Sequence, residues 1–254
     1  REAGSWNKPT VTKIISIGVA CTFVAALIGC YMTEYQPVLQ GHVLQLEAVN
    51  ARDRGQASLA HSLIDQAIQT DPWAPMPRRL MADFRLRQWL GKQIQRNWGP
   101  FTDAMADYEK SSPHHYTMHE ERGQWLLLAA RKTKNAEKLQ LAADAFETAI
   151  KCYPNSAFLH AQLATVYADQ DRTADARREA DEAKRLDDLC PHREQKLDRR
   201  HVFEPEPAHY TKVEDGKSRP FTAAEVVALL RGGDAELPAE SKNNETKKTA
   251  EPTP

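Results

Sequence analysis

The sequence has little of what several specialised protein classes require. Its 254 residues include only four Cys, 11 Gly and 15 Pro, and aromatic residues make up 7% of the chain. Four cysteines are too few for a disulfide-stabilised scaffold, and the glycine and proline content excludes a collagen-like chain. The formal net charge of −1 lacks the basic excess that is typical of nucleic-acid-binding proteins. We therefore expect no nucleic acid among the partners.

Recognisable catalytic motifs are also missing from the sequence. It has no nucleophile elbow, phosphate-binding loop, zinc-binding pattern or glycine fingerprint of a dinucleotide-binding fold. His114, His115 and His119 form the densest histidine cluster, but the spacing offers no further ligand for a metal site. We interpret them as solvent-facing residues where a helix begins. The sequence thus predicts no catalytic residue, cofactor or metal site within this chain.

One long apolar run stands out in a chain whose mean hydropathy is −0.64. Residues 14–33 contain no charged side chain, and a helix of this length spans about 30 Å, the thickness of a bilayer's hydrocarbon core. Basic residues precede the run, whereas no Lys or Arg follows it until Arg52. The positive-inside rule therefore predicts a cytoplasmic polar lead over residues 1–13. We expect a single transmembrane helix in a bacterial inner membrane, with the remainder of the chain periplasmic or otherwise extracytoplasmic.

A second interpretation of the same run concerns Cys30. The residues Leu27-Ile28-Gly29-Cys30 resemble the lipobox of bacterial lipoproteins, in which the cysteine is lipidated and the residues before it are removed. The polar lead is long for such a signal, and apolar residues continue past Cys30 through Met32. A retained membrane helix is the favoured interpretation, and both interpretations place the rest of the chain outside the cytoplasm.

The middle of the chain contains an internal repeat. Two segments share a small, a large apolar, a small and a proline residue at offsets 0, 4, 7 and 12; these are Ala60, Ile64, Ala67 and Pro72, and Ala142, Phe146, Ala149 and Pro154. Small residues on one helix face let antiparallel helices approach closely, and proline cannot continue the helix. The pattern resembles the tetratricopeptide repeat (TPR). That resemblance implies stacked helix pairs with a concave groove that binds a protein or peptide partner.

The resemblance predicts an all-α fold, a TPR-like right-handed solenoid of about four helix pairs over residues 41–188. Two pairs fit the repeat well, residues 76–112 resemble a degenerate copy, and the last copy has Asp188 where proline is expected. An unrelated helical bundle is the alternative fold.

Beyond the repeats the pattern ends. Residues 189–221 are expected to form an extended capping segment, and residues 222–231 a short helix opened by a capping box from Thr222 to Glu225. Residues 232–254 lack apolar side chains that could pack, and we expect a disordered tail.

Two sets of residues are candidates for binding. The TPR register places Gln45, Arg79, Arg131 and Thr165 at or near the groove. Basic residues also gather over 78–96, near Trp89 and Trp98, and arginine binds phosphate with two hydrogen bonds. Such a patch suits anionic lipid headgroups or a lipid-linked phosphate; the alternative is a solvated helix face paired with acids elsewhere. The candidate residues are Gln45, Arg78, Arg79, Arg85, Arg87, Arg131 and Thr165.

Cys152 and Cys190 leave two alternatives open. They form a disulfide in an oxidising compartment, or Cys152 is reduced and buried while Cys190 is exposed. Spacing alone does not decide between them, because a disulfide depends on the distance between the two residues in the fold.

The apolar helix followed by repeats, which end in YPNSAFLHAQLATVYADQ, also resembles the C-terminal region of bacterial O-antigen ligase/polymerase-type membrane proteins. The start at Arg1 and the hydrophilic lead, readable as a last cytoplasmic loop, agree with this. The resemblance implies glycan transfer from a polyprenyl diphosphate carrier, with the catalytic residues in upstream segments, so it assigns no catalytic residue here. Three hypotheses follow: a membrane-anchored TPR scaffold, which we favour, the C-terminal region of such an enzyme, or a lipidated TPR protein of envelope assembly.

Overall fold

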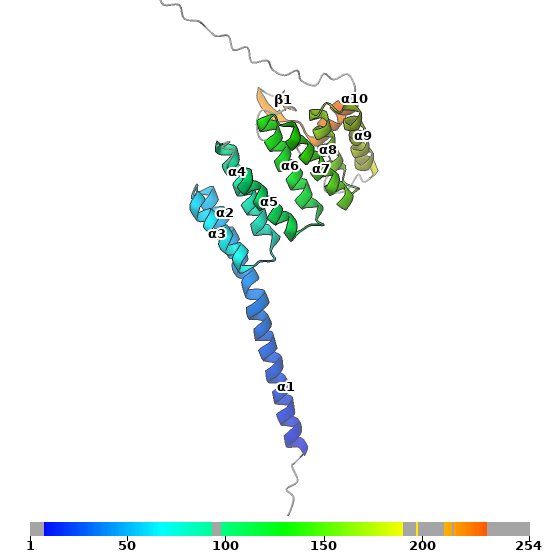
Figure 1. Ribbon diagram of the computed structural model, residues 1–254. Helices are drawn as coiled ribbons and strands as arrows, with labels where there is room; N and C mark the ends of the chain where they lie inside the picture. The colour runs from blue at the N-terminus through cyan, green and yellow to red at the C-terminus, as the bar shows by residue number, and fades with distance from the viewer. Residues whose placement is uncertain (1–7, 93–97, 190–196, 198–210, 215, 233–254) are drawn as a thin grey trace, which may run out of the picture. The chain divides into compact units, whose positions relative to one another are not determined.

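The computed structural model describes residues 8–92, 98–189, 197, 211–214 and 216–232. The chain divides into two units, residues 1–113 and 114–254, and each is described by itself. Within the described residues the secondary structure is almost entirely helical, which confirms the predicted all-α fold class (Figure 1).

The N-terminal unit begins with a continuous helical rod (Figure 1). It consists of α1 (Lys8–Cys30), the π-helical segment η1 (Tyr31–Tyr35) and α2 (Gln36–Asp53). The sequence did not predict that the apolar helix continues without a break into the first repeat helix. Pro37, near the start of α2, lacks an N–H and would crowd a regular preceding turn. The wider turn of η1, in which the Gln36 N–H donates to the Tyr31 carbonyl, accommodates the proline.

Three further helices follow in this unit, namely α3 (Ala57–Thr70), α4 (Pro75–Lys92) and α5 (Trp98–Ser111). Helix α2 packs on α3, α3 on α4, and α4 on α5. Between α2 and α3 the chain reverses at Gly55, whose φ of +76° is a conformation that glycine adopts without strain.

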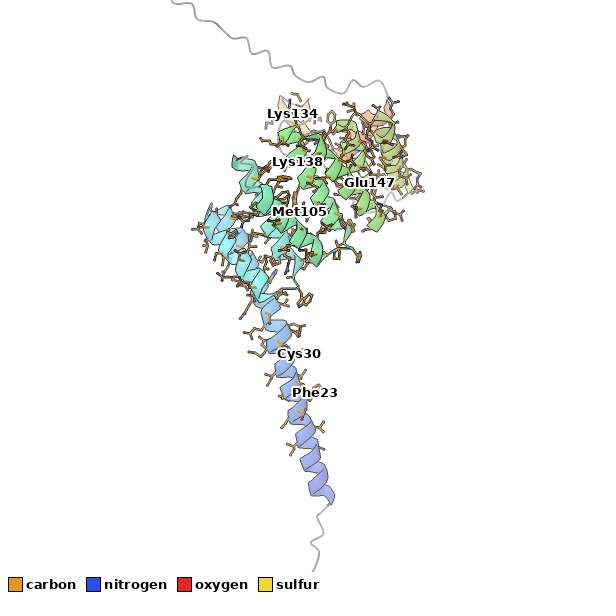
Figure 2. All side chains as sticks on the ribbon, in the orientation of Figure 1. Phe23, Cys30, Met105, Lys134, Lys138 and Glu147 are labelled. Carbon is orange, nitrogen blue, oxygen red and sulfur yellow. The ribbon has the colours of Figure 1, made fainter. Side chains whose placement is uncertain are left out.

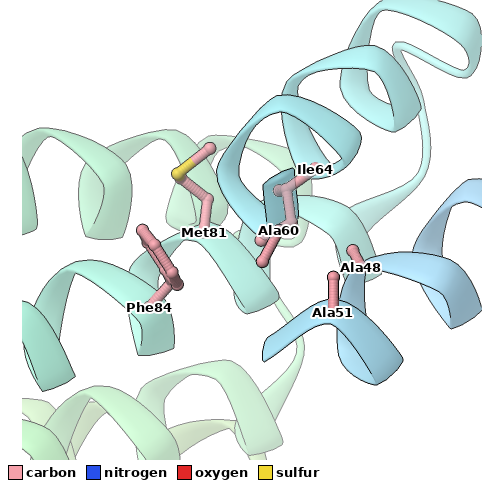
Figure 3. Close-up of a cluster of buried hydrophobic side chains, with 6 residues drawn as sticks. All are labelled: Ala48, Ala51, Ala60, Ile64, Met81 and Phe84. Atoms are coloured by element: carbon pink, nitrogen blue, oxygen red, sulfur yellow. The ribbon is translucent and has the colours of Figure 1, made fainter. Parts of the chain in front are cut away.

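A small apolar core joins the first three of these packed helices. Figure 3 shows Ala48 and Ala51 of α2, Ala60 and Ile64 of α3, and Met81 and Phe84 of α4. Because the alanines contribute only methyl groups, α2 and α3 approach closely. The larger side chains of α4 complete the core.

The second unit contains two helix pairs and a capping helix. Its elements are α6 (Tyr116–Thr133), α7 (Ala136–Cys152), α8 (Ala157–Asp169), α9 (Thr173–Leu189), β1 (Thr211–Glu214), β2 (Lys217–Pro220) and α10 (Ala223–Gly232). Helix α6 pairs with α7 and α8 with α9, while α7 also packs on α8. Asn135 and Ser156 cap α7 and α8 by accepting hydrogen bonds from the backbone N–H groups of Lys138 and Leu159.

The repeat positions predicted from the sequence are confirmed as core. The predicted alanines of the three copies are fully buried, namely Ala60, Ala67, Ala142, Ala149, Ala176, Ala180 and Ala183. Ile64 and Phe146, which occupy the large position between the alanines, are buried as well. The described part of the chain thus contains four TPR-like helix pairs, α2–α3, α4–α5, α6–α7 and α8–α9.

Two short strands precede the last helix. β1 and β2 form an antiparallel hairpin that pairs Thr211 with Pro220 and turns at Gly216, where φ is +73°. The sequence did not predict strands in this segment. The predicted capping box of α10 is confirmed, since the Thr222 N–H donates to Glu225 Oε2 at 2.7 Å and the Glu225 N–H to Thr222 Oγ1 at 3.2 Å.

Helix α10 closes the last pair. It packs against both α8 and α9, and it buries Ala223, Val226 and Val227. A solenoid end needs such a cover, because the last pair otherwise exposes an apolar face. The tail predicted to be disordered, beyond Gly232, lies outside the described residues.

Gly123 provides a test of the close approach between α6 and α7. A Cβ at this position would lie 2.8 Å from two ring carbons of Phe146, whose side chain is fully buried. We expect Gly123→Ala to lower the free energy of unfolding by about 1–2 kcal/mol. Overpacking costs about 1–3 kcal/mol, and the higher helix propensity of alanine offsets up to about 1 kcal/mol of that cost. Urea unfolding followed by circular dichroism measures the loss. Gly91→Ala, in open space on α4, is the matched control and should be neutral or stabilising; an equal loss in both variants would contradict the account.

Candidate binding surfaces

Helix α2, the first helix of the first pair, keeps an apolar face exposed. Val38, Leu39, Val43 and Leu46 each expose 53% of their surface. Exposed apolar patches of this kind mark interaction sites when they are contiguous. A shallow depression lies on this face and is lined by Leu39, Gln40, Val43, Leu44 and Glu47. Gln45, the candidate predicted on this helix, is partly buried and does not line the depression.

The arginines of α4 are engaged with neighbouring groups. Arg87 Nε donates to Asp83 Oδ2 at 2.8 Å, and this bond raises the pKa of Arg87. Arg85 contacts Gln88 and His61, and Arg78 Nη1 donates to the Ala74 carbonyl oxygen at 2.8 Å. Arg79 Nη1 lies 4.0 Å from the sulfur of Met76. For Arg87, the structure supports a helix face paired with acids rather than a patch open to phosphate.

The two tryptophans predicted to accompany these arginines do not form an exposed patch. Trp89 is 3% exposed, and its ring lies edge-on to that of Trp98 with centroids 4.9 Å apart. Trp98 in turn contacts the buried Phe101. The pairing of α4 with α5 therefore uses these rings as core.

Two candidates of the second unit are buried rather than open to a ligand. Arg131 Nε bonds Asp169 Oδ2 at 2.7 Å, and the two side chains expose only 10% and 7% of their surface. Thr165 is fully buried and its hydroxyl donates to the Ala161 carbonyl at 2.9 Å. The prediction that these side chains lie at a groove surface is wrong for Thr165, because α7, α9 and α10 pack around α8 and bury it from Ala157 to Tyr167.

The histidine cluster divides between solvent and core. His114 and His115 are exposed, and His115 stacks on Tyr116 with ring centroids 5.5 Å apart. His119 is buried, so the expectation that all three face solvent is wrong for it; it lies one turn into α6, on the side that also buries Met118. Within the described part of the chain, no group of three potential ligands lies close enough to hold a metal.

The cysteines are exposed where they are described. Cys152 lies at the end of α7 and is exposed, so the alternative in which it is buried is wrong. Cys190 lies outside the described residues. Cys30, the candidate lipidation site, is exposed at the end of α1.

A buried acid–base pair that the sequence did not reveal joins α8 and α9. His160 Nδ1 lies 2.7 Å from Glu179 Oε2, and His160 Nε2 lies 3.2 Å from the Pro154 carbonyl. Glu179 Oε2 and the Pro154 carbonyl oxygen both accept hydrogen bonds, so the imidazole lies between two acceptors. Burial raises the pKa of Glu179, but the hydrogen bonds and charges of His160 and of Arg178, whose Nε donates to Glu179 Oε1 at 3.2 Å, together hold that pKa below its usual value. The pair stabilises the α8–α9 hairpin.

The Glu179 pair makes stability depend on pH. A carboxyl whose pKa is lowered by folding stabilises the protein above its ordinary pKa of 4.5, and this contribution is lost as the pH falls through the lower folded value. We expect Glu179→Gln to lower the free energy of unfolding by about 1.5–3 kcal/mol at pH 7. The difference in free energy of unfolding between this variant and wild type should shrink below pH 4.5. Urea unfolding at pH 7 and pH 3.5 measures both. Glu182→Gln, which removes an exposed pair with Arg185, should cost about 1 kcal/mol or less. A constant difference for Glu179→Gln across the two pH values would contradict the assignment.

Comparison with known proteins supports the repeat interpretation. Residues 145–178, from the second half of α7 into α9, match the family model for the tetratricopeptide repeat. The matched segment straddles two of the copies predicted from the alanine pattern, the one that ends at Pro154 and the one that starts near Ala157, and it supports TPR repeats there. A search of curated proteins found no match.

Solved structures include similar chains. A thermophilic TPR protein from Thermus thermophilus is 19% identical, with a TM-score of 0.43, over 58% of this chain and 75% of that one. MamA from Desulfovibrio magneticus, from residue 41 to its end, is 17% identical, with a TM-score of 0.45, over 59% of this chain and 76% of that one.

Proposed function

We propose that this chain is a membrane-anchored scaffold whose TPR-like helix pairs bind another protein outside the cytoplasm of a bacterial cell. The rod formed by α1, η1 and α2 is the observation that carries the proposal. The helix from Ser16 to Asp53 is continuous over 38 residues and includes a stretch long and apolar enough to cross a membrane.

The surface of α1 supports its placement in lipid. All its described side chains, from Ser16 to Cys30, are exposed, and Figure 2 shows Phe23 and Cys30 projecting from the rod with no other element of the unit against them. The hydroxyls of Thr22 and Thr33 donate to the carbonyls of Gly18 and Gly29 within the same helix. These two hydroxyls are thereby satisfied without water, as a lipid environment requires.

The direction of insertion follows from charge. Lys8 and Lys13 precede the apolar stretch, and the next basic residue along the chain is Arg52. The positive-inside rule then assigns the lead to the cytoplasm and the helix pairs that follow the anchor to the other side, the periplasm in a Gram-negative bacterium.

The native Cys152 offers a direct test of this topology. Because Cys152 is exposed at the end of α7, a membrane-impermeant maleimide should label it in spheroplasts without lysis. The test uses a chain in which Cys152 is the only cysteine, because Cys190 lies on the same proposed side of the membrane and could pair with Cys152. Cys152→Ser in that chain removes the signal, and Ser5→Cys in the resulting cysteine-free chain should be labelled only after permeabilisation. Labelling of Cys152 that requires lysis would reject the extracytoplasmic placement.

Partner binding is assigned to the exposed apolar face of α2. A photo-crosslinking amino acid at Val43, in the depression, should form an adduct with one defined protein in cells. The same residue at Leu59, an apolar position of α3 that is 47% exposed, is the matched control and should form none. Adducts of equal yield from both positions would indicate nonspecific contact and reject the assignment.

A second candidate is the C-terminal region of a polytopic O-antigen ligase/polymerase-type glycan-transfer protein. Ala25, Gly29 and Thr33 follow one another at intervals of four residues on the rod, and a side chain at Gly29 would meet open space. Small residues at this spacing are typical of helices that pack against other membrane helices. In that protein the packed helices belong to one polypeptide, so Gly29→Leu should lower its thermal unfolding temperature in detergent, whereas Val24→Leu should not. An isolated anchor would tolerate both.

The lipidated alternative is tested by mass. A mature protein that begins at Cys30 and carries acyl chains would establish a lipoprotein of envelope assembly. A mass that retains residues 14–29 would support the membrane helix.

A further inference from the structure

We infer that residues 71–79, which form the turn between α3 and α4 and the start of α4, dock on the surface of the bilayer beside the anchor, with the Trp73 ring inserted at the lipid interface. This inference rests on the proposed membrane anchoring of α1. The turn binds the lipid interface itself, as its position, exposure and chemistry indicate.

The turn lies at the membrane-proximal end of the first helix pair. A side chain at Gly41 of α2 would lie 3.2 Å from Cβ of Asp71 and 3.8 Å from the Ala67 carbonyl oxygen. The end of α3 is therefore level with Gly41, in the second turn of α2, whereas the reversal at Gly55 is at the opposite end of the pair. Residues 71–74 form the tip, where the Ala74 N–H donates to the Asp71 carbonyl.

The turn lies just outside the headgroup layer when the rod stands upright in the membrane. Gly41 follows Thr33, the end of the apolar stretch, by eight residues of helix, or about 12 Å. The headgroup layer occupies roughly 5–8 Å on each side of the core. A helix tilt of about 20° toward α3, whose axis lies about 8–10 Å from that of α2, lowers the turn by about 3 Å. The proposed docking requires the exposed Trp73 side chain to bridge the remaining few ångströms.

The exposure of Trp73 is unusual for so large an apolar side chain. It is 89% exposed, although its backbone is fixed by a hydrogen bond from its N–H to Asp71 Oδ1 at 3.2 Å. Met76, three residues on, is 44% exposed. Tryptophan is enriched at membrane interfaces, where its ring lies among the headgroups, and Tyr31 and Tyr35 on the adjoining rod are exposed at the same boundary.

The chemistry beside the tryptophan suits lipid phosphate. Arg78 and Arg79 lie near the start of α4, at the end of this segment, and both side chains are partly exposed. Arg78 is oriented toward the turn by its bond to the Ala74 carbonyl. Guanidinium groups bind phosphate with two hydrogen bonds, and basic residues near an anionic leaflet strengthen binding. Of the arginines of α4 predicted to bind an anionic surface, these two adjoin the turn.

Fluorescence quenching tests the inference on the full chain. The chain is reconstituted in vesicles of phosphatidylcholine and phosphatidylglycerol, with or without phosphatidylcholine brominated near the carbonyl region. The difference between wild type and Trp73→Phe isolates the emission of Trp73, which should be quenched by the brominated lipid. Leu59→Trp in the Trp73→Phe background moves the reporter to the opposite end of α3, about 20 Å away, and should not be quenched.

The arginines are tested in the same vesicles. Arg78→Gln and Arg79→Gln should each reduce the ratio of molecules with a docked turn to molecules with an undocked turn roughly fivefold. The reduction is measured as a loss of Trp73 quenching. Arg54→Gln, at the far end of the same helix pair, should have no effect. If the chain floats with the vesicles but the Trp73 emission is unquenched, docking is rejected and the anchor stands. If the chain does not associate with vesicles at all, the proposed anchoring itself fails.

Discussion

Phe146→Ala is expected to lower the free energy of unfolding by about 3–5 kcal/mol, one of the two largest losses from a single substitution in this chain. The Phe146 ring is fully buried on α7 and approaches the backbone of α6 at Gly123. Ala142 and Ala149, one turn before it and about one turn after it, are also fully buried. These alanines already hold the helices in close contact, so the helices cannot collapse into the space that the ring leaves, and a cavity remains.

The effect is measured by urea unfolding of the full chain in detergent. Leu141→Ala, on the same helix but 38% exposed, is the matched control and should cost much less. Gly123→Ala combined with Phe146→Leu supplies a second check, because the smaller side chain makes room for the added methyl group and the two losses should not add. Equal losses for Phe146→Ala and Leu141→Ala would contradict the repeat packing.

Asp169→Ala should be comparably damaging, at about 3–5 kcal/mol. The carboxylate of Asp169, at the end of α8, bonds Arg131 of α6 at 2.7 Å, and both side chains are nearly buried. Removing the acid leaves a guanidinium without this carboxylate in a site with little access to water. The pair thereby joins the first helices of two successive repeats.

Two variants separate this role from a surface effect. Asp175→Ala breaks exposed ion pairs with Arg172 and Arg178 and should cost about 1 kcal/mol or less. The double variant Arg131→Met/Asp169→Leu replaces the pair by apolar groups of similar size and should recover most of the loss. If Asp169→Ala were nearly neutral, Arg131 would be available to a ligand, and the groove role predicted from the repeat register would regain support.

The sequence predicted the parts of the fold that depend on short-range patterns. Alanine spacing located the helix pairs, because Ala60 and Ala142 occupy the same place in their repeats. Thr222 and Glu225 predicted the start of α10, because a capping box involves residues only three positions apart. The strands were missed because TKVE and KSRP are short and largely polar, without the apolar alternation of a buried strand.

The candidate residues were predicted less well, because their environment depends on contacts between distant segments. Arg131 and Asp169 are 38 positions apart, and Thr165 is buried only because α7, α9 and α10 surround α8. Trp89 lies near the candidate basic patch in the sequence but packs in the core, whereas Trp73 is exposed and was not singled out. Sequence patterns identify residue types suited to an interface, but burial is set by tertiary packing.

Alkaline carbonate extraction of membranes from cells that express the full chain tests the central claim most directly. The account predicts that the intact protein stays in the membrane pellet. It also predicts that Phe23→Arg together with Leu27→Arg shifts the protein toward the supernatant, because each charge near the middle of a membrane helix costs about 2.5–3.5 kcal/mol. Release of the intact wild-type chain into the supernatant would contradict a helix that spans the bilayer.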